Sequence, residues 1–137
     1  ICQLSERNFA YNVLVLDERG ELDIGTSGSI GNFSDKISFA RKEVGFENGI
    51  RALSPNIIVT DELGQKEDVD AVEYAINCGV TVFASVHCDS IDSFLNKPNF
   101  EKVIQNKLFE RYVLLSLRNG PGTLEGIYNE NFSRIRI

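Results

Sequence analysis

Residues Ile57–Thr60 read IIVT and are followed directly by Asp61 and Glu62. Asn12–Leu16 reads NVLVL and is followed in the same way by an Asp-Glu pair. Short apolar runs rich in β-branched residues are typical of strands buried in a parallel sheet. We therefore predict two buried strands, each with two carboxylates at its carboxyl end.

The segments around these strands alternate between helical and extended patterns. Apolar residues recur at helical spacing over Phe39–Leu53 and Glu67–Asn77, and Gly79 is the expected C-cap of the second helix. Val80–Val86 is a third apolar run, which ends before His87. Strands that alternate with helices imply parallel βαβ units, so we predict an α/β fold with a mainly parallel sheet flanked by helices.

The remaining elements are expected to be short. Helical pieces are predicted over Ile91–Leu95 and Asn99–Asn106. Arg111–Leu117 and Thr123–Tyr128 are predicted to be strands of a C-terminal β-hairpin, because the Asn-Gly-Pro-Gly sequence between them favours a turn. The Gly- and Ser-rich segment Gly20–Ser34 predicts a mobile surface loop.

Composition excludes several functional classes. The 137 residues are 42% hydrophobic and 25% charged, which suits one globular core. Fourteen basic and twenty acidic residues give a net charge of −6, so no DNA-binding surface is expected. The longest apolar run is far shorter than the roughly 20 residues of a membrane-spanning helix. Three cysteines without framework spacing favour a reduced, cytoplasmic location.

The predicted topology brings acids to one edge of the sheet. Ligands of parallel sheets bind outside the carboxyl ends of the strands, where both acid pairs and His87 would converge. Mg²⁺ suits such carboxylates, because it binds through one or two of them together with substrate phosphates. An apolar strand followed by Asp-Glu is also the pattern of a Walker B strand, in which Asp holds the metal and Glu polarises water. The alternative is that the acids simply face solvent.

His87 is the only histidine and has two possible interpretations. It is either a sensor of the γ-phosphate or a hydrogen-bonded histidine at the rim of the sheet. A nucleophilic pair with Cys88 is not expected, because consecutive strand residues point to opposite faces. Cys2 and Cys78 are expected to be small apolar packing residues.

Five segments, in this order along the chain, resemble the stage III sporulation protein AA family, a relative of the type II and type IV secretion ATPases. They are Val15–Glu21 (VLDERGE), Arg51–Glu62 (RALSPNIIVTDE), Asn77–His87 (NCGVTVFASVH), Phe109–Val113 (FERYV) and Gly122–Tyr128 (GTLEGIY). The resemblance implies a RecA-like ATPase core that uses ATP and Mg²⁺ and works as a ring, usually of six subunits.

The resemblance also implies roles for individual residues. Asp17 and Glu18 match an Asp box that organises the metal-bound water, with Asp17 at the metal. Asp61 and Glu62 match Walker B, with Asp61 at the metal and Glu62 as the base, and His87 matches a His box. Three arginines are candidates for compensating phosphate charge or for subunit contacts: Arg19, Arg51 and Arg111.

The chain departs from the family pattern because it contains no G-x-x-x-x-G-K-[ST] loop, the Walker A motif. Ile1–Glu6 resembles the end of the helix that follows this loop. Residues 1–137 are therefore expected to be the C-terminal part of a single RecA-like domain, without the P-loop strand. By resemblance, the setting is endospore formation, with the ATPase on the mother-cell cytoplasmic side of a membrane complex whose channel proteins it drives.

Two rival interpretations remain open. A phosphoacceptor receiver domain also places an acid pair after its first strand, and Lys97–Pro98 matches its Lys-Pro dipeptide. The short interval between Ser85 and Lys97, and Glu62 beside the acceptor position, argue against it. A non-hydrolysing binding module with an ATPase-like fold is the second rival, against which the intact acid pairs and His87 argue.

Overall fold

The structure is a computed structural model that describes residues 11–18, 20, 22, 33–37, 39 and 41–136. The chain divides into two compact units, residues 1–86 and 87–137, each of which is described by itself. In these described ranges no helix is long and apolar enough to cross a membrane. Four sequence expectations lie wholly or mostly outside the described residues: those for Ile1–Glu6, Cys2, Arg19 and the Gly20–Ser34 loop.

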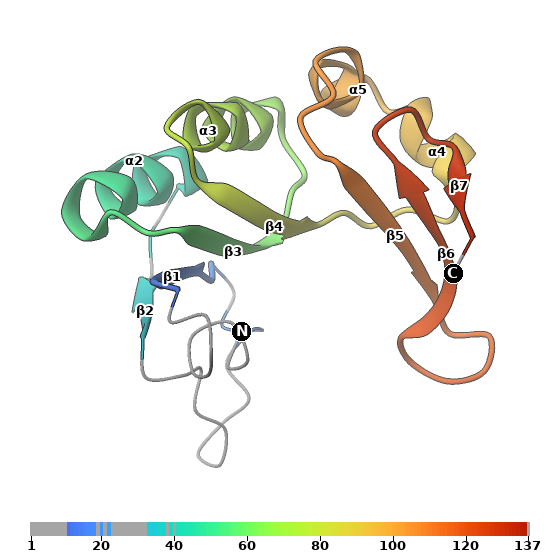
Figure 1. Cartoon of the computed structure of the whole chain (residues 1–137), viewed down its shortest axis with the longest axis horizontal. Helices are drawn as coiled ribbons and strands as arrows, with labels where there is room; N and C mark the ends of the chain where they lie inside the picture. The colour runs from blue at the N-terminus through green and yellow to red at the C-terminus, as the bar shows by residue number, and fades with distance from the viewer. Residues whose placement is uncertain are drawn as a thin grey trace. The chain divides into compact units, whose positions relative to one another are not determined.

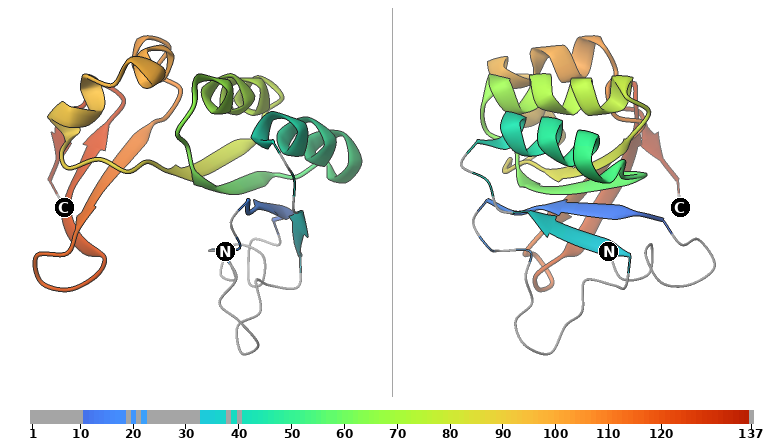
Figure 2. Two further views of the ribbon diagram at one scale, coloured as in Figure 1. Left: turned by 180° about the vertical axis from the view of Figure 1, so that it is seen from behind. Right: turned by 90° about the vertical axis from the view of Figure 1, so that its left-hand side faces the viewer.

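The first unit is a four-stranded parallel sheet with two helices (Figure 1). Its elements are β1 (Val13–Leu16), β2 (Ser34–Ile37), α2 (Lys42–Leu53), β3 (Ile57–Glu62), α3 (Lys66–Asn77) and β4 (Thr81–Ser85). The order across the sheet is β2-β1-β3-β4, and every neighbouring pair is parallel. The two helices lie side by side over the same face of the sheet in both views of Figure 2.

The core of this unit is formed by β1 and the residues that pack on it. All four residues of β1 are fully buried, as are Ile58 of β3 and Phe46 of α2. Helix α2 lies close to β1 at Gly49. A Cβ atom added at this position would lie only 2.3 Å from Cδ2 of Leu14. A glycine therefore stands inside this helix to allow the approach, although glycine is a poor helix former.

Local signals end the helices where the sequence predicts. Ser54, just after α2, has a left-handed φ of 45° and precedes a proline, which cannot continue the helix. The carboxylate of Asp68 accepts hydrogen bonds from the backbone N–H groups of Gly64 (2.8 Å) and Gln65 (2.9 Å) at the start of α3. Gly79 follows α3 with a φ of +82°, as expected of a glycine near a helix C-terminus.

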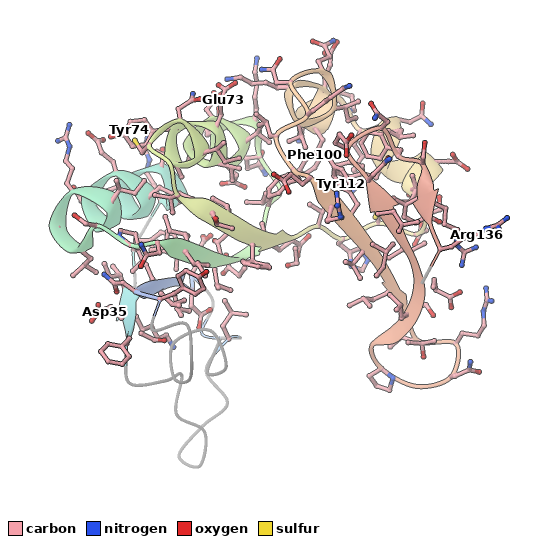
Figure 3. The ribbon with its side chains drawn as sticks, viewed as in Figure 1. Asp35, Glu73, Tyr74, Phe100, Tyr112 and Arg136 are labelled. Carbon is pink, nitrogen blue, oxygen red and sulfur yellow. The ribbon has the colours of Figure 1, made fainter. Side chains whose placement is uncertain are left out.

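The second unit packs short helices against a three-stranded antiparallel sheet (Figure 1). Its elements are α4 (Ile91–Leu95), a 3₁₀ helix (Pro98–Phe100), α5 (Glu101–Gln105), β5 (Arg111–Ser116), β6 (Thr123–Asn129) and β7 (Arg134–Ile135). The predicted hairpin is confirmed as β5 and β6. Phe94, Phe100, Tyr112 and Phe132 form an aromatic cluster, two members of which are labelled in Figure 3.

Several local expectations are wrong. The sequence pattern did not predict β2, whose residues SDKI carry no apolar run, and it forms one edge of the sheet. The third predicted strand, Val80–Val86, is shorter in the structure, where β4 spans Thr81–Ser85. It is also less buried than predicted, since Phe83 is 50% exposed. Val44, one of the apolar residues in the helical pattern predicted over Phe39–Leu53, is exposed, and so is Cys78, which does not act as a packing residue.

Candidate functional site

The parallel pairing of β1 with β3 makes the two acid pairs neighbours. Leu16 is in register with Thr60, so both strands reach their carboxyl ends together. The backbone N–H of Glu18 donates a hydrogen bond of 2.9 Å to Oδ2 of Asp61. The predicted meeting of Asp17, Glu18, Asp61 and Glu62 at one sheet edge is therefore found in the first unit.

Burial divides each acid pair into an inner and an outer carboxylate. The side chains of Asp17 and Asp61 are 0% and 5% exposed, whereas that of Glu18 is 44% exposed and Glu62 is partly exposed. Successive residues of an extended chain point to opposite sides, which accounts for this alternation. The aspartates thus belong to the packed structure, and the glutamates reach toward solvent.

The inner carboxylate of Asp17 has a cationic partner on the edge strand. Nζ of Lys36, in β2, lies 3.1 Å from Oδ2 of Asp17. The same oxygen accepts a hydrogen bond of 3.2 Å from the backbone N–H of Leu22. Because a buried carboxylate is costly without such partners, the pairing of β2 with β1 offsets part of the cost of burying Asp17.

Asp61 is paired with Lys42, the first residue of α2. Nζ of Lys42 lies 2.8 Å from Oδ1 of Asp61 and 3.3 Å from Oε2 of Glu18, and it donates a hydrogen bond of 2.6 Å to the carbonyl oxygen of Glu62. Burial by itself would lower the pKa of the Lys42 ammonium. The hydrogen bond and charge of Asp61, with smaller contributions from Asp68 and Glu18, outweigh burial and raise the pKa of Lys42 above its ordinary value.

Sequence reasoning overlooked both lysines. Lys42 shares the buried side of α2 with Gly45, Phe46 and Gly49, three, four and seven positions further along. A lysine on the packed stripe of a helix is a signal for a buried ion pair, because lysine is almost never fully buried unless it is paired. No comparable signal marks Lys36, because β2 itself was not predicted.

The other predicted site residues in the described part of the chain have partners or surroundings of their own. His87 is exposed and begins the second unit, and its backbone carbonyl accepts a hydrogen bond from Nζ of Lys97. Arg51 is exposed and pairs with Glu47 at 2.9 Å, one helical turn earlier. Arg111, in the second unit, donates to the carbonyl of Glu110 at 2.7 Å.

The carboxylates at this edge fit Mg²⁺ only if water and phosphate complete its coordination. Across the described ranges, no three His, Cys, Asp or Glu side chains group closely enough to hold a metal by themselves. Both oxygens of Asp61 already accept from protein donors, Lys42 and the Glu18 amide, yet a carboxylate has about four lone-pair sites. Mg²⁺ commonly keeps waters and binds through one or two carboxylates plus phosphates. Asp61 and Asp17 are the carboxylates of this site that fit that pattern.

The class of fold is shown by a solved structure. The X-ray structure of the ATPase DotB from Legionella pneumophila matches with a TM-score of 0.63 at 12% sequence identity. The match covers 91% of this chain and 38% of that chain. The chain thus has the mixed α/β fold found in that ATPase, and the predicted fold class is confirmed.

Sequence comparison defines the family. Residues 1–135 match the family model described as "Sporulation stage III, protein AA". The chain is 33% identical over 121 residues to Stage III sporulation protein AA of Bacillus subtilis (strain 168). The chain belongs to the sporulation stage III protein AA family, which confirms the resemblance and argues against a receiver domain. The alignment covers 85% of this chain and 39% of that relative, so the chain spans well under half of its length.

Proposed function

We propose that this chain is part of an ATPase that hydrolyses Mg-ATP during endospore formation. The observation that supports the proposal best is the meeting of two Asp-Glu pairs on adjacent parallel strands, joined by the 2.9 Å hydrogen bond from the Glu18 amide to Asp61. The likeness to DotB, an ATPase by its title, and membership of the sporulation family point in the same direction.

The family resemblance suggests a division of labour between the acids. Asp61 and Asp17 would hold Mg²⁺ through their remaining lone pairs, with the phosphates of ATP and water completing its ligands. When bound, Mg²⁺ neutralises charge that develops on the phosphates. Glu62, which is partly exposed, would polarise the attacking water, and Glu18 would orient that water from the neighbouring strand.

The basic residues and His87 have roles at the phosphates in this proposal. By the family resemblance, His87, two residues after the end of β4 in the sequence, would sense the γ-phosphate. Arg19, Arg51 and Arg111 would compensate phosphate charge or contact a neighbouring subunit. An exposed arginine such as Arg51 can reach a second chain without loss of a buried contact.

At the level of the cell, we propose a homo-oligomeric ring, with six subunits as the expected number. It would lie at the mother-cell cytoplasmic face of a sporulation complex and would couple hydrolysis to membrane-embedded channel proteins. Residues 1–137, as part of a single RecA-like domain, would supply the residues that activate water in each nucleotide site.

The test is Mg-dependent ATP hydrolysis by the full-length protein, with wild type compared with Glu62→Gln. Loss of the water-polarising carboxylate should reduce kcat at least about 100-fold, whereas binding of a fluorescent ATP analogue should be unchanged. Glu67→Gln, at an exposed acid in the first turn of α3, is the matched control and should hydrolyse ATP like wild type.

Two results would contradict the proposal in different ways. Wild-type turnover in Glu62→Gln would remove Glu62 as the base but leave the ATPase in place. Absence of turnover in the wild-type protein, at concentrations that form rings, would favour a non-hydrolysing binding module.

A further inference from the structure

The backbone at the end of β3 is irregular where the candidate base is placed. The pairing of β3 with β4 shifts register between Val59 and Glu62. Beyond the shift, the backbone N–H of Leu63 donates to the carbonyl of Ser85 at 2.8 Å, and the carbonyl of Glu62 accepts from Lys42 at 2.6 Å. A backbone that leaves the regular ladder keeps its conformation only where other contacts hold it.

Lys42 is suited to hold this backbone because it joins three parts of the unit. Its side chain is 6% exposed, and its ammonium reaches Asp61 at the end of β3, Glu18 just after β1, and the carbonyl of Glu62. An ammonium has three N–H donors, and three acceptors face it here. Since Lys42 begins α2, the helix is tied to both strands at the site.

We infer that Lys42 is a positioning residue of the site, which holds the Asp61 carboxylate and the Glu62 backbone in the arrangement needed for hydrolysis. Oδ1 of Asp61 contacts Lys42, and Oδ2 of Asp61 accepts a hydrogen bond from the backbone N–H of Glu18. Asp61 therefore links Lys42 to the ends of both strands. This inference rests on the proposed ATPase function. It assigns Lys42 no contact with nucleotide.

The inference predicts a local effect when the ammonium is removed. Lys42→Gln keeps a polar side chain but removes the charge and one of the three N–H donors, and its amide nitrogen ends one bond short of the ammonium position. The contacts of Asp61 and Glu62 would loosen, and a shift of the base by about 1 Å can cost on the order of 100-fold in rate. Binding of ATP should change little, because the inference gives Lys42 no contact with the nucleotide.

The experiment combines kinetics with amide hydrogen exchange on the full-length protein. We expect kcat of Lys42→Gln to fall by about 10-fold or more, with the KM for ATP within about three-fold of wild type. In the absence of ATP, exchange at the amides of Glu18 and Leu63 should accelerate about 10-fold more than exchange at the core amides of Ile58 and Val59, which reports any global loss of stability. Lys66→Gln, at an exposed lysine at the start of α3, is the control and should change neither readout.

A second variant keeps the test informative if Lys42→Gln does not fold. Lys42→Arg retains the charge, but its planar fork cannot replace a single point donor among three acceptors, so a reduced kcat with an unchanged KM is expected again. Circular dichroism and the melting temperature establish which variants are folded before either readout is taken.

The outcomes separate this inference from the proposed function. Exchange at Glu18 and Leu63 that stays at the wild-type rate would overturn the inference whatever the activity. Faster exchange with an unchanged kcat in an active enzyme would show that Lys42 is structural only. A wild-type protein without ATP hydrolysis would instead refute the proposed function, and the exchange data would still report whether Lys42 holds the strand ends.

Discussion

At the scale of single residues, the two aspartates at the sheet edge are buried ions with dedicated partners. Asp61 with Lys42 and Asp17 with Lys36 are ion pairs between elements far apart in the sequence. A buried pair contributes little net stability, but removal of one partner commonly costs about 3–5 kcal/mol, because the other charge stays buried. These pairs are therefore better explained as devices that orient carboxylates than as sources of stability.

The hydroxyl of Tyr112 is also buried, and it leads to a prediction about pH. This hydroxyl has no hydrogen-bond partner among the described residues, and burial raises the pKa of Tyr112 to about 12. The unfolded chain loses this proton near pH 10, before the folded protein does. The free energy of unfolding should therefore fall as pH rises from about 10 to about 12.

Tyr112→Phe should abolish that part of the pH dependence. At pH 7 it should be neutral or stabilising by up to about 1 kcal/mol, because no hydrogen bond of the hydroxyl is lost. Urea unfolding at pH 7, 9.5 and 11 measures both effects, with Tyr74→Phe on the exposed side of α3 (labelled in Figure 3) as the control. A destabilised Tyr112→Phe protein at pH 7 would mean that the hydroxyl has a partner such as water.

At the scale of elements, α2 is the helix that joins the core to the site. One side of it places Lys42 at the carboxylates and, one and two turns later, Phe46 and Gly49 against the core. The distance between α2 and β1 therefore also determines the distance between the Lys42 ammonium and the carboxylates at the sheet edge. A change in the packing of Gly49 should be felt at both ends of this helix.

Gly49→Ala is expected to destabilise the protein, although alanine is the better helix former. The added Cβ would lie 2.3 Å from Cδ2 of Leu14, which is fully buried and has little room to move. Overpacking costs about 1–3 kcal/mol, and the helix preference recovers about 1 kcal/mol. Thermal and urea unfolding should show a net loss, whereas Asn48→Ala, at an exposed neighbouring position, should be neutral or stabilising. Equal stability of the two variants would mean that α2 can shift away from β1.

At the scale of the whole molecule, the proposed ring predicts a concentration dependence. If each nucleotide site is completed by a neighbouring subunit, turnover per subunit should rise with protein concentration and level off once rings are formed. ATP hydrolysis and sedimentation velocity, measured over the same protein concentrations, would show whether turnover per subunit rises where rings form. Turnover per subunit that is constant down to concentrations where only monomers sediment would contradict the ring but not the ATPase.

The sequence by itself determined most of the helices and strands and the two acid pairs. Ile57–Thr60, α3 and the β5–β6 hairpin were predictable because apolar periodicity, helix capping and turn residues act over a few neighbouring positions. The approach of the two acid pairs followed from the parallel topology that these elements imply. The family resemblance then supplied the roles of residues such as Glu62 and His87, which stay predictions.

Only the tertiary structure decided which charges are paired and which side chains are buried. The polar strand β2 has no apolar pattern, so its place beside β1 and the contact of Lys36 with Asp17 could not be predicted from local sequence. Lys42 stands 19 positions before Asp61 but lies 2.8 Å from it, because α2 returns over the sheet. Burial of an ion depends on partners brought together by the whole chain, and a short stretch of sequence does not contain that information.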